Sequence, residues 1–227
     1  MQDGIGRTRF KVLVFPGLLL GVLFILAPLG RAEPPGGRGK FDSPLSRFTA
    51  EQQKLLLAGE SLYLPSIEEP PAGGEPKFTA AAFIVINAPV EKCFPMFLDF
   101  EKQYLYLPQI KTSKILSRSG NRVVIYKELD YPVLDLKYTH LLTIDPKAHR
   151  VDFITDPKGA NSVKLSAGFF QFESIDDART LFTYRMTRLD PGIEIPRFIQ
   201  EYMVSRDLPQ VTVNIKKYIE SGGKWRK

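Results

Sequence analysis

The sequence predicts an α+β fold: a curved antiparallel sheet of about seven strands wrapped around one long C-terminal helix, with two short helices after the first strand. Three observations support this fold class. Short β-branched and aromatic runs, separated by turn residues, follow one another between residues 79 and 188. Apolar residues at helical spacing follow the first run and recur from Ile195 to Ile219. Because one face of such a sheet has to be buried, we expect the last helix to cover it.

The chain has 227 residues, of which 44% are hydrophobic and 25% are charged. This composition excludes collagen-like, disordered and multi-span membrane proteins as descriptions of the whole chain. Without residues 1–32 the chain has 27 basic and 24 acidic residues, a net charge of +3, which does not indicate nucleic-acid binding. One cysteine excludes an internal disulfide, and two histidines exclude most histidine-built metal sites. We therefore expect no metal and no cofactor.

The first 32 residues are typical of a secretory signal peptide. Basic residues within 7–11 precede an apolar run at 12–27, and small residues lead up to Ala32, after which we expect cleavage. The run is shorter than the roughly 20 residues that cross a bilayer comfortably, which favours cleavage over the alternative of an N-terminal anchor in the inner membrane. The mature protein is then expected outside the cytoplasm, in a bacterial periplasm.

Residues 33–76 are rich in proline and glycine and are expected to form a leader. Within it, Thr49 and Gln52 form a capping box, so we predict a short helix at 49–58 that docks on the rest of the protein. Residues 61–66 have the composition of a short strand.

The regular pattern begins at residue 77 and defines a domain at 77–221. The run Thr79–Ile86 predicts a strand, and Asn87 or Ala88 is expected to cap the helix that follows, with Pro89 in its first turn. Pro95 should bend this helix.

Asp99 is expected to cap a second short helix through Tyr106. The next predicted strands are Thr112–Ser117, Arg122–Leu129, Leu136–Ile144, Arg150–Thr155, Val163–Glu173 and Thr180–Arg188. The last helix, Ile195–Ile219, should be interrupted at Leu208-Pro209.

Aromatic residues alternate along several of these strands and share one face. Phe182, Tyr184 and Met186 lie on one side of their strand, and Tyr138 and His140 on one side of theirs. One interpretation is a completely filled core. The other is an apolar cavity between the sheet and the long helix, in which buried tyrosine hydroxyls supply scattered polar points.

Several motifs resemble the START-like, helix-grip superfamily (SRPBCC), and within it most closely the polyketide cyclase/dehydrase and coenzyme Q-binding branch. These are Ile86-Asn87-Ala88-Pro89-Val90-Glu91-Lys92-Cys93-Phe94, Phe97-Leu98-Asp99-Phe100-Glu101, Leu107-Pro108-Gln109-Ile110, Gly168-Phe169-Phe170-Gln171-Phe172, Leu181–Met186, Ile195-Pro196-Arg197-Phe198 and Arg206-Asp207-Leu208-Pro209. Their order and spacing, over about residues 77–221, carry the resemblance. It implies a hydrophobic tunnel under the C-terminal helix that binds lipids, sterols, quinones or polyketides.

The resemblance implies that Phe97, Tyr104, Phe170, Tyr184, Phe198 and Tyr202 line this tunnel. Together with the alternation along the strands, it gives the candidate ligand-binding residues Phe97, Tyr104, Tyr126, Tyr138, His140, Phe153, Phe170, Phe172, Phe182, Tyr184, Met186, Phe198 and Tyr202.

Catalytic candidates are few. His140 and Glu128 could act on a bound substrate, but a hydrogen-bonded structural histidine and a solvated carboxylate are the favoured interpretations. Cys93 lies on the apolar stripe of the first helix and is interpreted as a core residue. The sequence alone therefore assigns no catalytic residue.

The sequence as a whole favours a secreted binding or carrier protein for a hydrophobic small molecule such as a lipid, sterol or isoprenoid quinone. It does not determine the oligomeric state, for which a monomer is the default. Two alternatives stay open: an enzyme of the cyclase or dehydratase type acting on a polyketide-like substrate, and a protein-interaction module with a filled cavity. The basic tail at 222–227 is a solvated helix end or a transient contact with anionic lipid.

Overall fold

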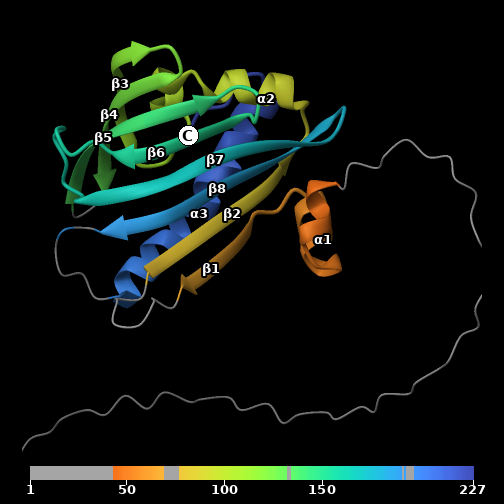
Figure 1. Ribbon diagram of the computed structural model, residues 1–227. Coiled ribbons are helices and arrows are strands. Elements are labelled where there is room, and N and C mark those ends of the chain that lie inside the picture. The colour runs from red at the N-terminus through yellow and green to blue at the C-terminus, as the bar shows by residue number, and fades with distance from the viewer. Residues whose placement is uncertain (1–42, 69–76, 132–133, 191, 193–196) are drawn as a thin grey trace, which may run out of the picture. The chain divides into compact units, whose positions relative to one another are not determined.

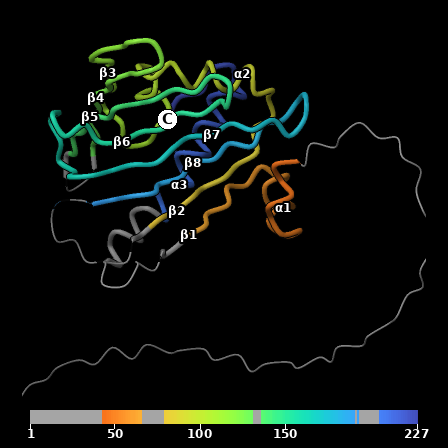
Figure 2. Tube along the Cα trace, in the orientation of Figure 1, coloured from red at the N-terminus to blue at the C-terminus, as the bar shows by residue number. Residues whose placement is uncertain are grey.

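Eight antiparallel strands form one sheet in the computed structural model, which describes residues 43–68, 77–131, 134–190, 192 and 197–227. The strands are β1 (Leu62–Glu68), β2 (Lys77–Ile86), β3 (Ile110–Ser119), β4 (Arg122–Tyr131), β5 (Leu134–Asp145), β6 (Arg150–Thr155), β7 (Leu165–Asp176) and β8 (Arg179–Asp190). Their order in the sheet is β1-β2-β8-β7-β6-β5-β4-β3, so β1 and β3 form the two edges (Figures 1 and 2). The predicted signal peptide lies outside the described residues.

The α+β fold class is confirmed. The sheet curves around α3 (Arg197–Glu220), and α2 (Val90–Phe97) with the 3-10 helix η2 (Phe100–Leu105) follows β2 directly (Figure 1). The sheet has one strand more than the seven expected. The additional strand is β1, which pairs with β2 from Leu62 opposite Phe83 onward, so the sheet begins inside the segment interpreted as a leader.

The predicted capping box is present at the start of α1 (Ala50–Leu57). The Gln52 backbone N–H donates to Thr49 Oγ1 at 3.3 Å, and the Thr49 N–H donates to Gln52 Oε1 at 3.0 Å. The predicted cap of α2 is wrong by one or two residues: Pro89 itself takes the N-cap position, since its extended backbone leads into the helix and its carbonyl accepts from Cys93 N at 3.0 Å.

The interruption predicted at Leu208-Pro209 is not observed, because α3 continues through Pro209 to Glu220. A proline inside a helix removes one backbone hydrogen bond. Packing on both sides of Pro209 outweighs that loss: Leu208 is buried against β2 and β8, and Ile215 and Ile219 are buried in the main core.

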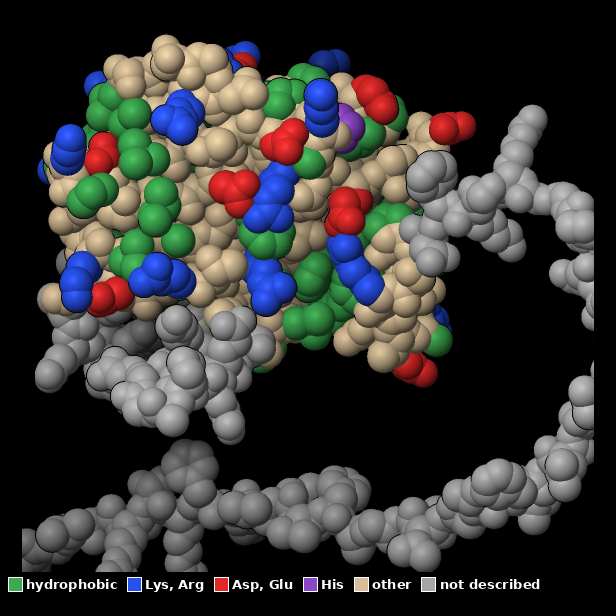
Figure 3. All heavy atoms as spheres, viewed as in Figure 1, with side chains coloured by type: hydrophobic (Ala, Val, Ile, Leu, Met, Phe, Trp, Pro, Cys, Tyr) green, Lys and Arg blue, Asp and Glu red, His purple; other side chains and the backbone are tan. Residues whose placement is uncertain are grey.

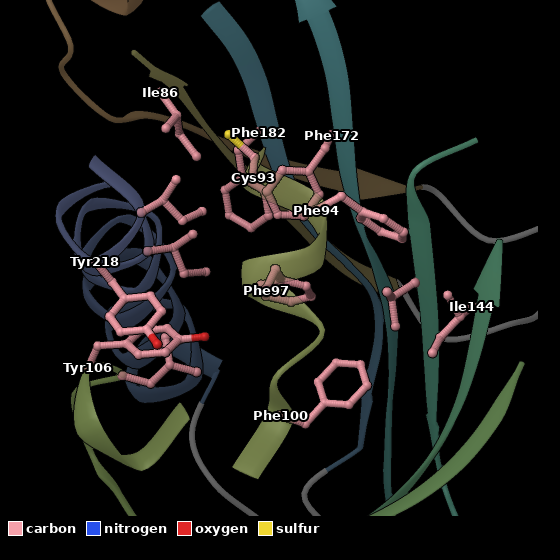
Figure 4. Close-up of a cluster of buried hydrophobic side chains, with 14 of the residues drawn as sticks. Ile86, Cys93, Phe94, Phe97, Phe100, Tyr106, Ile144, Phe172, Phe182 and Tyr218 are labelled. Carbon is pink, nitrogen blue, oxygen red and sulfur yellow. The ribbon is translucent and has the colours of Figure 1, made fainter. Parts of the chain in front are cut away.

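The inner, concave face of the sheet carries the main core. Near α2, rings from α2, β7 and β8 pack together: Phe97 lies 5.2 Å from Phe172 and 6.0 Å from Phe182 between ring centroids. Figure 4 shows these rings between α3 and the sheet, with Tyr106 and Tyr218 stacked at 4.0 Å. This tight cluster joins α2, η2 and α3 to the sheet.

The outer, convex face has its own smaller core at one end. Residues of η1 (Pro44–Arg47) and α1 cover Val85 and Leu181 there, and Phe48 makes an edge contact with Phe83 at 5.0 Å between centroids. The view in Figure 3 shows basic and acidic side chains lying next to one another on the surface. On β6, Arg150 pairs with Asp152 and lies 3.6 Å over the Phe169 ring.

A glycine sits where β7 and β8 change register. The pairing shifts between Ala167 and Gly168, and a Cβ on Gly168 would lie 2.0 Å from the Arg185 carbonyl oxygen and 2.8 Å from the tip of the Phe153 ring. Gly168 therefore lets the two strands and Phe153 approach closely.

Candidate functional site

A polar group of side chains lies on the concave face, at the end of the sheet away from the α2 cluster. Strand alternation brings them together. In β4, Ile125 and Lys127 point inward, and the register places His140 of β5 opposite Ile125 and Tyr138 opposite Lys127.

Lys127 is buried, with 8% of its surface exposed, and its Nζ donates to Gln103 Oε1 at 2.6 Å. Gln103 comes from η2 and is 2% exposed. Burial without water around the ammonium group lowers the pKa of Lys127 to about 7. A substantial share of Lys127 is therefore an uncharged amine at neutral pH.

His140 is also 8% exposed, and its Nε2 is buried without a hydrogen-bond partner. Its ring lies between two aromatic rings, with centroids 4.3 Å from Tyr138 and 5.1 Å from Phe153. Burial first, and the nearby charge of Lys127 second, lower the pKa of His140 to about 3. The imidazole is neutral at physiological pH.

Two tyrosines complete the polar group. Burial raises the pKa of Tyr138 and of Tyr184 far above the ordinary value, with smaller contributions from Tyr184 for the first and from Asp207 for the second. Both phenols therefore keep their protons, and each can donate or accept a hydrogen bond.

These groups enclose a cavity of about 40 Å³. Its lining comprises Phe100, Gln103, Lys127, Tyr138, His140, Leu142, Phe153, Phe170 and Tyr184. The volume is enough to hold a water molecule. The interior is thus not completely filled among the described residues, and one end of the space is polar while the rest is aromatic and aliphatic.

The structure brings five of the predicted ligand-binding residues to the cavity: Tyr138, His140, Phe153, Phe170 and Tyr184. It places Phe97, Phe172 and Phe182 in the packed cluster near α2, and Met186 against Ala80, Ala82 and Leu208. The side chains of Phe198 and Tyr202 lie outside those that the structure describes.

Three predicted positions are wrong. Tyr126 and Glu128 lie on the outer face of β4, where the Tyr126 hydroxyl donates to Glu128 Oε1 at 2.8 Å. The reason is the alternation of β4, in which Lys127 takes the inward position between them. Tyr104 is 44% exposed on η2 and points away from the interior. Glu128 therefore cannot act in the cavity.

The sequence reasoning missed Lys127 and Gln103. A signal for Lys127 was present, because Val123, Ile125 and Leu129 form an inward apolar row at spacing two and Lys127 occupies one place in it. Gln103 carries no such signal: it lies in a short 3-10 helix, and only the packing of η2 under the sheet brings it to Lys127.

Other candidate chemistry is absent from the described residues. Burial raises the pKa of the Cys93 thiol to about 11, and the thiol donates toward the Ala88 carbonyl at 3.5 Å, so Cys93 is the core residue predicted. No group of three or more potential metal ligands occurs in the part of the chain that the structure describes.

The basic tail is bound to the protein itself. Lys227 Nζ donates to the carbonyl oxygens of Pro108 and Ile110, and Trp225 packs against the main core under the Lys217 ammonium group. Within the described residues, no helix combines the length and the apolar character that crossing a bilayer requires.

No protein-family model matches the sequence, and no curated protein does. Solved structures match it. An aromatase/cyclase, Zhui, from Streptomyces sp. R1128 superposes with a TM-score of 0.53 at 19% identity, over 64% of this chain and 97% of that one. A START superfamily protein from Mycobacterium smegmatis gives 0.56 at 12% identity, over 63% and 97%. A STAR-related lipid transfer protein from Xanthomonas axonopodis gives 0.56 at 14% identity, over 68% and 98%.

At such low identity these similarities show the fold alone. The resemblance inferred from the motifs of residues 77–221 agrees with them. The chain has the START-like helix-grip fold.

Proposed function

We propose that the protein binds a hydrophobic small molecule, such as a lipid, sterol or isoprenoid quinone, between the concave face of the sheet and α3, and carries or shields it. The observation that carries the proposal is the cavity of about 40 Å³, walled by Leu142, Phe153 and Phe170 and closed at one end by polar side chains. Apolar walls with a few placed polar groups are typical of small-molecule sites. Solved structures with this fold include one described as a lipid transfer protein.

The cavity is small for such a ligand, so binding requires the lining side chains to move and enlarge it. We expect Phe153, Phe170 and Tyr184 to change rotamer together, because their rings pack against one another with centroids 4.7 to 6.1 Å apart. A guest that displaces them gains the burial of its own apolar surface, about 25 cal/mol per Å².

Native mass spectrometry of the mature chain, followed by lipid extraction, tests this proposal. We expect a co-purified apolar molecule, or uptake of sterols, quinones or fatty acids by the delipidated protein. Leu142→Phe, which fills the cavity, should abolish uptake. Leu141→Phe is the matched control, because Leu141 is the next residue in β5 but points outward and is 38% exposed. A protein that takes up none of these ligands contradicts the proposal.

A second candidate function is an enzyme of the cyclase or dehydratase type. The observation that favours it is the convergence of Lys127, His140, Tyr138 and Tyr184 on one cavity, since ionisable groups with shifted pKa values gather at catalytic sites. A solved structure with this fold is described as an aromatase/cyclase. The same mass spectrometry distinguishes a carrier from an enzyme. A carrier releases a polyketide-like probe unchanged, whereas an enzyme releases a product that is lighter by one water molecule.

We also propose that the protein works outside the cytoplasm, on the basis of the signal-like pattern in residues 1–32. Transfer of an apolar molecule across an aqueous gap suits such a location. Expression of the full chain in a bacterium, followed by cell fractionation, should give a periplasmic protein that begins at Glu33. A chain that keeps residues 1–32 in the membrane fraction contradicts the cleavage and supports the anchor.

Transient contact with an anionic membrane is the least supported part of the proposal. Lys216 and Lys227 already bind carbonyl groups of the protein, so fewer charges of the tail are available to lipid than its sequence suggests. Sedimentation with phosphatidylglycerol vesicles tests the contact: binding that salt abolishes supports it, and no binding contradicts it.

A further inference from the structure

The buried ammonium group of Lys127 has no acidic partner in the cavity. Among the described lining residues there is no aspartate or glutamate, and the hydrogen-bond partner of Lys127 is the neutral amide of Gln103. Buried charges in proteins are normally paired. The amine therefore faces a space in which an anion would be strongly favoured and in which the protein itself provides none.

A second group in the same cavity lacks a partner. His140 Nε2 is buried and without a hydrogen-bond partner, in a side chain more than nine-tenths buried. Buried polar atoms in native proteins are satisfied with few exceptions, and each exception asks for an explanation. Both His140 and Lys127 line the cavity, so a single ligand group can hydrogen-bond to His140 and pair with the charge of Lys127.

We propose that this polar end binds the carboxylate of an apolar carboxylic acid, with one oxygen paired to Lys127 and the other accepting a hydrogen bond from His140. This inference deepens the proposed function and rests on it. A carboxylate is a small anion with two acceptor oxygens, one for each of these two groups. The apolar body of the acid would lie against Phe153 and Phe170.

Alternative head groups fit less well. A neutral alcohol or ester would leave the charge of Lys127 uncompensated, so binding would require the uncharged amine. A phosphate monoester has five heavy atoms in its head and carries up to two negative charges, against one cationic side chain among the described lining residues. A single carboxylate matches the charge of the site.

The proposal makes binding depend on pH. Above neutral pH the amine of the free protein is largely uncharged, so binding of the acid has to draw a proton onto Lys127. The groups that face the site are Gln103 from η2, Tyr138 and His140 from β5, Tyr184 from β8 and, near Tyr184, Asp207 from α3. Because the tyrosines and His140 keep one protonation state through this range, Lys127 should dominate the dependence.

Calorimetric titration of the delipidated mature protein with three probes on one alkyl chain, decanoate, decanol and decanal, tests the inference. We expect decanoate to bind at least about tenfold more tightly than decanol at neutral pH. Between pH 7 and 9 the affinity for decanoate should fall by about tenfold per pH unit, while that for decanol should not fall. This arm uses the unmodified protein.

Lys127→Met should remove the preference for decanoate and leave decanol binding within about twofold. Lys114→Met, at an exposed position of β3, is the matched control and should keep the preference. Circular dichroism establishes that each variant is folded, and Lys127→Gln serves if the methionine variant is not.

The outcomes are distinguishable. Binding of decanoate and decanol with equal affinity and no pH dependence overturns the acid preference but leaves the proposed function standing. No binding of any probe overturns both. A third outcome concerns decanal, which can form an imine with Lys127 by loss of water, and cyanoborohydride then reduces this imine to a stable amine. If decanal is captured in this way and decanoate is not preferred, the site recognises a carbonyl group and the proposed ion pair is wrong.

Discussion

The two ends of the concave face differ in what they bury. Near α2, Phe97, Phe172 and Phe182 fill the space and are at most 1% exposed. Near β4 and β5, the same face buries Lys127 and His140 beside a small cavity. The first end stabilises the fold through close packing of rings, while the second accepts a cost in desolvated polar groups. This cost of desolvation, which the first end does not have, is the reason for proposing the second end as the ligand site.

The packed end should be the more sensitive to truncation. Phe182→Ala removes a fully buried ring whose centroid lies 4.6 Å from that of Phe172, and we expect a loss of about 3–5 kcal/mol in the free energy of unfolding, measured by urea denaturation. The control Leu116→Ala, at a 58% exposed position, should cost less than about 0.5 kcal/mol. A loss at Phe182 no larger than at Leu116 would remove the contrast between the two ends.

At the polar end, loss of the positive charge of Lys127, by a rise in pH or by substitution, should stabilise the protein. The folded state lowers the pKa of Lys127 from 10.5 to about 7, so between these pH values the unfolded chain binds a proton that the folded chain does not. The free energy of unfolding of the unmodified protein should therefore rise with pH across this window, by about 2–4 kcal/mol in total.

Lys127→Met should lack this rise and should exceed the unmodified protein in stability at pH 6. Urea midpoints at a series of pH values from 6 to 10 provide the measurement, with Lys114→Met as the variant that keeps the rise. Parallel curves for the unmodified protein and Lys127→Met would show that the amine is solvated.

His140 predicts a smaller effect on the acid side. Its pKa falls from 6.5 to about 3 on folding, so below pH 6.5 the unfolded chain takes up a proton first and stability decreases as the pH falls. His140→Phe keeps a ring between Tyr138 and Phe153 but has no imidazole to protonate. Its free energy of unfolding should therefore fall by about 1–3 kcal/mol less than that of the unmodified protein when the pH is lowered from 6.5 to 4. Thermal melts of both proteins over this range test it, and equal acid losses would contradict it.

The smallest effect is expected on the outer face. Tyr126→Phe removes a partly buried hydrogen bond to Glu128 and should change stability by less than about 0.5 kcal/mol. Ligand affinity should not change, in contrast to Tyr138→Phe one strand away on the inner face. A marked loss of binding in Tyr126→Phe would mean that the alternation of β4 is opposite to the one described.

The order of elements could be predicted from the sequence because periodicities of two and 3.6 residues are local. The same alternation correctly brought Tyr138, His140 and Phe153 to one face. It fails in β4, where the prediction places Tyr126 at the ligand, whereas Lys127 takes the inward position and Tyr126 donates to Glu128. The burial of Lys127 depends on the curvature of the sheet and on Gln103 from η2, and neither can be predicted from the neighbours of Lys127 in the chain.

Gly168 affects the size of the cavity because it has no side chain. The tip of the Phe153 ring occupies the place where a methyl group on residue 168 would lie, which keeps that ring turned toward β7. A methyl there would drive the ring into the interior and also separate β7 from β8, since the Arg185 carbonyl oxygen is closer still. A single methyl group at residue 168 would thus change the shape of the cavity, although Gly168 does not line it.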